Sequence, residues 1–113
     1  MARAATTTDV FNAIAEPRRR QIVEVLAGKG ALAVGAIVLA VGLPQPAVSK
    51  HLGVLRKVGI VSVTSEGQQR LYRLEASALK PVYEWAKSFE RHWGHQLDRI
   101  KQRAEKRAKE QRG

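Results

Sequence analysis

The sequence of 113 residues contains no cysteine. This absence excludes disulfide bonds, thiolate metal sites, iron–sulfur clusters and cysteine nucleophiles. A chain of this length is expected to form one domain with a single hydrophobic core, although a partner subunit would help to bury apolar surface. Because no disulfide can stabilise the fold, we expect a cytoplasmic protein.

Long apolar segments are also missing. The longest, residues 31–43, has 13 residues, whereas a membrane-spanning helix needs about 20. Residues 1–8 contain one arginine with no apolar core behind it, unlike a secretion signal. We therefore expect neither a membrane span nor secretion.

Acidic residues are scarce relative to basic ones. Twenty lysines and arginines stand against ten aspartates and glutamates, which gives a formal net charge of +10 at pH 7. Such an excess favours a polyanionic partner, either nucleic acid or an anionic membrane surface. Half of the excess lies in residues 99–113, which hold seven basic and two acidic residues. A run of this kind can also be a solvated helix end.

Hydrophobic spacing predicts a short first helix that ends near Ala15. Thr7 or Thr8 can cap its N-terminus, with Asp9 in the first turn. One face of this helix is apolar and consists of Val10, Phe11 and Ile14.

Two further helices are expected before residue 43. The second begins at Pro17, because proline suits the first helical position. It ends at residues 28–30, which contain two glycines. The third is shorter, covers about residues 34–41 and stops at Gly42.

A fourth helix, expected over about residues 45–58, is the most informative segment. Pro44 and Pro46 lie in its first turn, where backbone N–H groups have no intrahelical partner to lose. At about 100° per residue, one broad face is formed by Ala47, Val48, His51, Leu52, Val54, Leu55 and Val58. The opposite face is polar and basic and carries no acid; it consists of Gln45, Pro46, Ser49, Lys50, Gly53, Arg56 and Lys57.

A β-hairpin and a long final helix complete the expected elements. Residues 60–65 are β-branched and alternating. A second run follows at residues 70–74, and the connection between the two, residues 66–69, contains Gly67. The long helix begins at about Lys80. It carries an apolar seam at steps of three and four, formed by Leu79, Val82, Ala86, Phe89, Trp93, Leu97, Ile100 and Ala104.

This order of helices followed by a hairpin is that of a winged helix-turn-helix. Within and just after residues 34–58 stand two characteristic segments, LPQPAVSKHL (residues 43–52) and LRKVGIV (residues 55–61). On these segments the chain resembles the ArsR/SmtB family of bacterial repressors. GQQRLYRL (residues 67–74) is similar to the family's wing, and AEPRRRQI (residues 15–22) to the start of its second helix. The resemblance covers about residues 7–100.

The resemblance implies a mainly α-helical fold with a small β-hairpin wing, which dimerises through its first and last helices. The expected organisation is a flexible N-terminus (residues 1–6), one DNA-binding and dimerisation domain (residues 7–104) and a basic C-terminal tail (residues 105–113). The expected dimer interface consists of Val10, Phe11, Ile14, Phe89, Trp93, Leu97 and Ile100.

The implied function is that of a sequence-specific DNA-binding repressor, which covers an inverted-repeat operator as a homodimer. Gln45 can pair with adenine, and Lys50 can reach guanine or phosphate. His51 falls on the apolar face, so we expect it to be packed or bonded to a phosphate rather than to read a base. The full expected DNA-binding set is Gln45, Pro46, Ser49, Lys50, His51, Arg56, Lys57, Gln68, Gln69 and Arg70.

Metal binding and catalysis have little support in the sequence. Many members of the resembled family sense metals through cysteines, or through histidine and carboxylate residues on the last helix. His92, His95 and Asp98 follow three-residue steps, but no further acid can be matched to such a site. We therefore expect no metal and no cofactor. No phosphate-binding glycine loop or nucleophile–base pair is present, so we expect no enzymatic activity.

Two other functions stay open from the sequence alone. A basic architectural protein that binds nucleic acid without sequence preference would suit the C-terminal run, and sequence-indifferent, salt-dependent binding would support it. A membrane-surface role is weaker, since residues 99–113 lack aromatic anchors. An effector of unknown identity is also compatible with the sequence.

Overall fold

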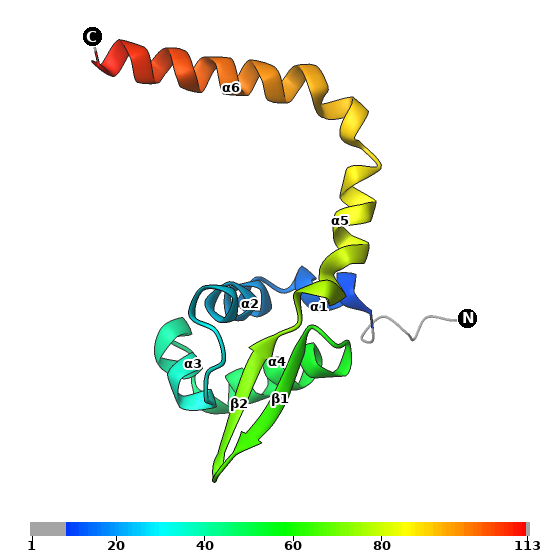
Figure 1. The fold of residues 1–113 in the computed structure, drawn as a ribbon, viewed down its shortest axis with the longest axis vertical. Coiled ribbons are helices and arrows are strands. Elements are labelled where there is room, and N and C mark those ends of the chain that lie inside the picture. Colours follow the sequence, from blue (N-terminus) through cyan, green and yellow to red (C-terminus); the bar gives the residue numbers. More distant parts are fainter. Residues whose placement is uncertain (1–8, 113) are drawn as a thin grey trace. The chain divides into compact units, whose positions relative to one another are not determined.

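The computed structural model describes residues 9–112, apart from the side chains of His95, Leu97, Asp98, Gln111 and Arg112. The chain divides between Val82 and Tyr83 into two units. In chain order the elements are α1 (Val10–Ala15), α2 (Pro17–Lys29), α3 (Val34–Val41), α4 (Gln45–Lys57), β1 (Val61–Glu66), β2 (Gln69–Leu74), a 3-10 helix (Ala76–Leu79), α5 (Lys80–Lys87) and α6 (Glu90–Arg112) (Figure 1).

The cap of α1 corrects the sequence-based expectation. Asp9 is the N-cap residue, and its carboxylate accepts a hydrogen bond from the Asn12 N–H at 2.6 Å. Aspartate accepts this bond as well as threonine does, and its charge also complements the positive end of the helix. Thr7 and Thr8, which we expected to act as the cap, lie outside the described residues.

Helices α2 and α3 have the predicted bounds. α2 begins at Pro17 and ends at Lys29, followed by Gly30 as the C-cap. α3 ends at Val41, and Gly42 adopts left-handed backbone angles of φ 70° and ψ 28°. Glycine adopts this conformation without the steric penalty that a side chain would bring. The chain can therefore turn sharply between α3 and α4.

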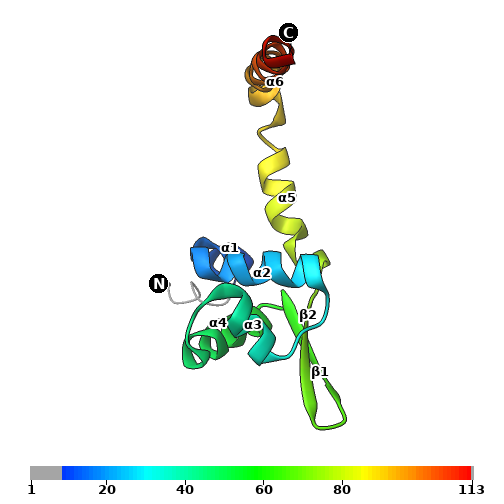
Figure 2. The ribbon, with the colours of Figure 1, turned by 90° about the vertical axis from the view of Figure 1, so that its left-hand side faces the viewer.

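The core of the first unit lies among α1, α2, α3, α4 and the base of the hairpin (Figures 1 and 2). Helix α4 contributes Val48, Leu52 and Leu55, all predicted on its apolar face. Among the described side chains, the buried core consists of Ala13, Ile22, Leu26, Ile37, Val41, Val48, Leu52, Leu55, Ile60 and Val61. Because one side of α4 is fixed in this core, its other side faces outward.

Strands β1 and β2 form the predicted antiparallel hairpin, which projects beyond α3 and α4 (Figure 2). Pairing runs from Val61 opposite Leu74 to Glu66 opposite Gln69, so the loop has two residues rather than the four expected. Gly67 has φ 64° and no other described residue of the loop has a positive φ, as a type II′ turn requires. This glycine therefore lets strand pairing extend further than its flanking residues suggested.

A further strand contact was not expected from the sequence. Leu32 pairs with Tyr72 through two backbone hydrogen bonds, of 2.9 Å from the Leu32 N–H and 2.8 Å from the Tyr72 N–H. A bridge of one residue has no periodicity and leaves no pattern in a sequence. It connects the middle of β2 to the segment before α3.

The prediction of one long final helix from Lys80 is wrong in one respect. The helix is interrupted at Ser88 and Phe89, which separate α5 from α6. The Ser88 hydroxyl donates a 2.6 Å hydrogen bond to the Trp85 carbonyl oxygen, and the Ser88 N–H is shared between the carbonyls of Glu84 and Trp85. Serine competes for backbone carbonyls in this way and disfavours a continuous helix. The expected apolar seam is therefore divided between α5 and α6.

Helix α6 has 23 residues and includes most of the segment expected to be a basic tail. Near its start, the rings of Trp85 and Phe89 meet edge to face with centroids 5.3 Å apart. Across residues 9–112, no helix is both long and apolar enough to cross a membrane.

Candidate nucleic-acid interface

The outward side of α4 is the first component of the candidate interface. Seven residues of the helix are exposed, the same seven predicted for its polar face: Gln45, Pro46, Ser49, Lys50, Gly53, Arg56 and Lys57. Three of them are cationic and none is acidic. In the described part of the chain, the side chains of Gln45, Ser49 and Lys50 make no hydrogen bond or ion pair. Their donors and acceptors are thus available to a ligand, and an α-helix fits the major groove of B-DNA.

The tip of the wing is the second component. Gln68 lies in the two-residue loop, and Gln69 and Arg70 begin β2; all three are exposed. The Arg70 guanidinium carbon lies 5.9 Å from the centroid of the Tyr72 ring, which keeps the arginine along one face of the hairpin. Arg73 is exposed on the other face of the strand. Cations on both faces can meet phosphates on either side of the wing.

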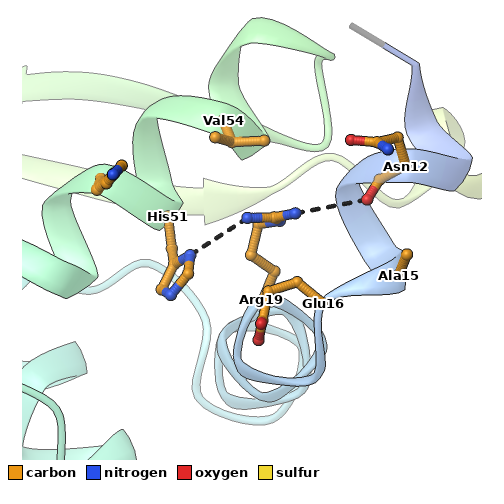
Figure 3. A pocket seen from close by; sticks show the side chains of 7 residues that line it. Asn12, Ala15, Glu16, Arg19, His51 and Val54 are labelled. Atoms are coloured by element: carbon orange, nitrogen blue, oxygen red, sulfur yellow. Dashed lines mark hydrogen bonds between the residues drawn. The ribbon is translucent and has the colours of Figure 1, made fainter. Parts of the chain in front are cut away.

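His51 is held against the second helix rather than presented with the polar face. It is half-buried, and its Nδ1 atom lies 3.4 Å from Nη1 of Arg19 (Figure 3). A guanidinium can only donate hydrogen bonds, so Nδ1 accepts and the proton of the neutral imidazole is on Nε2. His51 is therefore packed against α2, and its contact with a phosphate stays a prediction.

Arg19 is fixed by the end of α1 as well as by His51. Its Nε donates to the Ala13 carbonyl oxygen at 2.5 Å, and its Nη2 donates a longer bond of 3.5 Å to the Asn12 carbonyl oxygen. These carbonyls belong to a helix C-terminus, where no intrahelical donor is available. Arg19 therefore connects the end of α1 to the helix that carries the exposed polar face.

A cavity of about 540 Å³ opens beside this connection (Figure 3). It is lined by Asn12, Ala15, Glu16, Arg19, Lys50, His51 and Val54. From the sequence, Arg19 was only part of residues 15–22, which resemble the start of the family's second helix, and no partner was expected for it. No role was expected for Asn12 or Glu16. The one available signal was His51 itself, a polar residue at an otherwise apolar helix position.

Burial lowers the pKa of His51 below its ordinary value of 6.5, and the positive charge of Arg19 lowers it further. The Glu16 carboxylate acts in the opposite direction, while Lys50 and Arg18 add to the lowering. The imidazole is therefore neutral at pH 7, which is the form that can accept the hydrogen bond from Arg19.

We expect this lowered pKa to make the free energy of unfolding depend on pH. Between the folded-state pKa and 6.5 the unfolded chain binds more protons at His51, so stability falls as the pH decreases through that window. Urea unfolding at a series of pH values measures the slope. The His51→Gln variant should have a shallower slope than the wild type. An identical slope in wild type and His51→Gln would contradict the assignment.

The residues expected at a dimer interface lie in both units. In the first, Val10 and Ile14 pack partly against the core and Phe11 is 43% exposed. In the second, Phe89 and Ile100 are 40% and 59% exposed and Trp93 is half-buried. The side chain of Leu97 lies outside the described residues.

The candidate metal ligands can be placed only in part. His92 is exposed, and the side chains of His95 and Asp98 are outside the described set. Among the side chains that the structure does describe, no three histidines or carboxylates gather in one place.

Comparison with known proteins places the chain among regulators. Residues 16–63 match the family described as "Bacterial regulatory protein, arsR family". The transcriptional repressor SdpR of Bacillus subtilis strain 168 is 32% identical over 81 residues, which cover 72% of this chain and 89% of the relative.

Solved structures of two similar proteins share the fold. The transcriptional repressor BigR from Xylella fastidiosa is 34% identical, with a TM-score of 0.56 over 75% of this chain and 84% of that one. The homodimeric winged helix-turn-helix DNA-binding domain Mb0332 from Mycobacterium bovis, a possible ArsR-family regulator, is 29% identical. Its TM-score is 0.59 over 80% of this chain and 82% of that one.

Proposed function

Because this chain belongs to the arsR family of bacterial regulatory proteins, we propose that it is a repressor that binds an inverted-repeat operator as a homodimer. The single observation that carries the proposal is the exposed face of α4, which is polar, basic and free of acid. Bound at a promoter, such a dimer prevents polymerase from engaging. The protein acts in the cytoplasm, where its DNA is, and has no catalytic role.

Each part of the interface has its own task in this proposal. Gln45 in the first turn of α4 contacts a base edge, since an amide group pairs with adenine in the major groove. Ser49 contacts either a base or a phosphate. Lys50 reaches guanine or phosphate. His51, Arg56 and Lys57 hold the DNA backbone, and Pro46 packs beside it. At the wing, Gln68, Gln69 and Arg70 contact the backbone or an adjacent minor groove.

A homodimer is proposed because one recognition helix reads few base pairs. Two helices related by a two-fold axis read two half-sites about one DNA turn apart and add their contacts. The homodimeric state of the similar Mb0332 domain supports this assembly. The interface is formed by the first and last helices, through Val10, Phe11, Ile14, Phe89, Trp93, Leu97 and Ile100.

Two alanine variants test which residues contact bases and which contact the DNA backbone. Gln45→Ala should relax the base preference at one position of each half-site and cost about 1–3 kcal/mol per lost contact. Arg70→Ala should weaken binding to all sequences alike and lower the slope of log K against log salt by about one unit. Selection from random duplexes, followed by salt titration, measures both effects. If Gln45→Ala selected the wild-type motif, the wrong face of α4 would have been assigned.

A further inference from the structure

We propose that the cavity between α1, α2 and α4 binds one phosphate group, and that the DNA backbone supplies it. This inference rests on the proposed function, because the phosphate is that of DNA bound to α4. The cavity would extend the interface to Arg19 and Asn12, two residues that precede the helix-turn-helix in the sequence.

The cavity is rich in hydrogen-bond donors that have no partner among the described residues. The Lys50 ammonium makes no bond there. His51 uses Nδ1 to accept from Arg19, so its Nε2–H is left to donate. The Asn12 side-chain amide and the remaining guanidinium N–H groups of Arg19 complete the set (Figure 3). A phosphate oxygen accepts several charge-assisted hydrogen bonds, and this set of donors matches that need.

The charge of the cavity also favours an anion. Two permanent cations, Arg19 and Lys50, face one carboxylate, that of Glu16. The Glu16 carboxylate already accepts a 2.6 Å hydrogen bond from the Arg18 N–H at the start of α2. It is held there by the positive end of that helix. The net positive charge of the lining therefore remains available to a ligand.

The location of the cavity makes DNA the source of the phosphate. Lys50 lies at the edge of the exposed face of α4, and at about 100° per residue this edge adjoins Val54 and His51 on the cavity side. A helix in the major groove has a phosphate backbone along each of its two sides. DNA that contacts the exposed face would thus carry one backbone past the mouth of the cavity.

Asn12→Asp is the sharpest test, because it places a negative charge in the cavity with almost no change of shape. Asn12 is in the first turn of α1, where an acidic side chain is compatible with the helix dipole. We expect about a tenfold loss of affinity for operator and non-operator DNA alike, with a salt slope reduced by about one unit. Gln21→Glu is the matched control, since it brings the same change of charge to an exposed position of α2 outside the lining.

A second pair of variants removes a cation instead of adding an anion. Arg19→Gln should reproduce the loss, whereas Arg18→Gln, at an exposed neighbouring position outside the lining, should not. Circular dichroism and urea unfolding verify that each variant is folded. Equal losses within both pairs, Asn12→Asp with Gln21→Glu and Arg19→Gln with Arg18→Gln, would overturn the proposal.

Two further arms identify the source of the phosphate. The first uses an operator selected from random duplexes, in which single phosphates are replaced by uncharged methylphosphonates. Replacement of one particular phosphate in each half-site should weaken the binding of the wild type. The same replacement should leave the affinity of the Asn12→Asp variant unchanged. Inorganic phosphate at constant ionic strength should not give a saturable shift of the His51 imidazole resonances. Such a saturable shift would overturn DNA as the source.

The outcome is separable from the test of the proposed function. If the wild type prefers an operator and Gln45→Ala alters that preference while the cavity variants match their controls, only the phosphate site is wrong. If the wild type has no preferred sequence, the proposed function itself fails.

Discussion

Replacing both Phe89 and Trp93 by alanine is expected to give a monomer that binds its operator at least about 100-fold more weakly, since two linked half-site contacts become one. Phe89 is 40% exposed and Trp93 is half-buried within a single chain. A large aromatic side chain contributes about 2–3 kcal/mol when a partner buries it fully. Loss of two such side chains from each protomer therefore lowers the free energy of association enough to dissociate the dimer.

Sedimentation velocity at micromolar concentration and fluorescence anisotropy with the operator measure these two effects. Tyr83→Ala is the control, because Tyr83 is 60% exposed and lies outside the proposed interface. It should leave both the sedimentation coefficient and the affinity unchanged. A wild type that sediments as a monomer at this concentration would refute the proposed dimer.

Leu52→Ala is expected to lower the free energy of unfolding by about 2–5 kcal/mol, since it deletes a fully buried side chain and leaves a cavity. Leu52 is 1% exposed, in the core that fixes the inward side of α4. The adjacent Gly53→Ala provides a control on the same helix. A Cβ at Gly53 meets nothing within 4 Å, so this change should stabilise the protein by about 0.5–1 kcal/mol.

Urea unfolding of the two variants gives opposite shifts of the midpoint if the two sides of α4 are assigned correctly. A loss below about 1 kcal/mol for Leu52→Ala, well under the usual range for buried leucine, would show that the side chain is not in the core. A loss of stability in Gly53→Ala would show that the other side of the helix is covered.

Local signals explain why much of the fold could be predicted. Pro17, Gly30 and Gly42 mark helix ends through backbone geometry alone, and the structure places the ends of α2 and α3 at these residues. The division of α4 into two faces follows from helical periodicity, because burial in a small domain selects the apolar side. These features need no knowledge of distant contacts.

Features that depend on distant or competing contacts could not be predicted. The bridge between Leu32 and Tyr72 joins residues forty positions apart by one backbone pair. The break at Ser88 depends on a hydroxyl that competes with the helix for one carbonyl, whereas the apolar spacing continued across it. The contact between Arg19 and His51 depends on the packing of α2 beside α4. From the sequence, one could see only that His51 is a polar residue on the otherwise apolar face of α4.

The measurement that tests the central claim most directly is a competition between two duplexes at one salt concentration. One duplex carries the inverted repeat selected from random DNA, and the other carries the same sequence with one half-site scrambled. We predict two chains per intact duplex and an affinity at least about 100-fold higher than for the scrambled one, as linked half-sites require. Equal affinity for the two duplexes, with the same salt slope, would instead identify a basic protein that binds DNA without sequence preference.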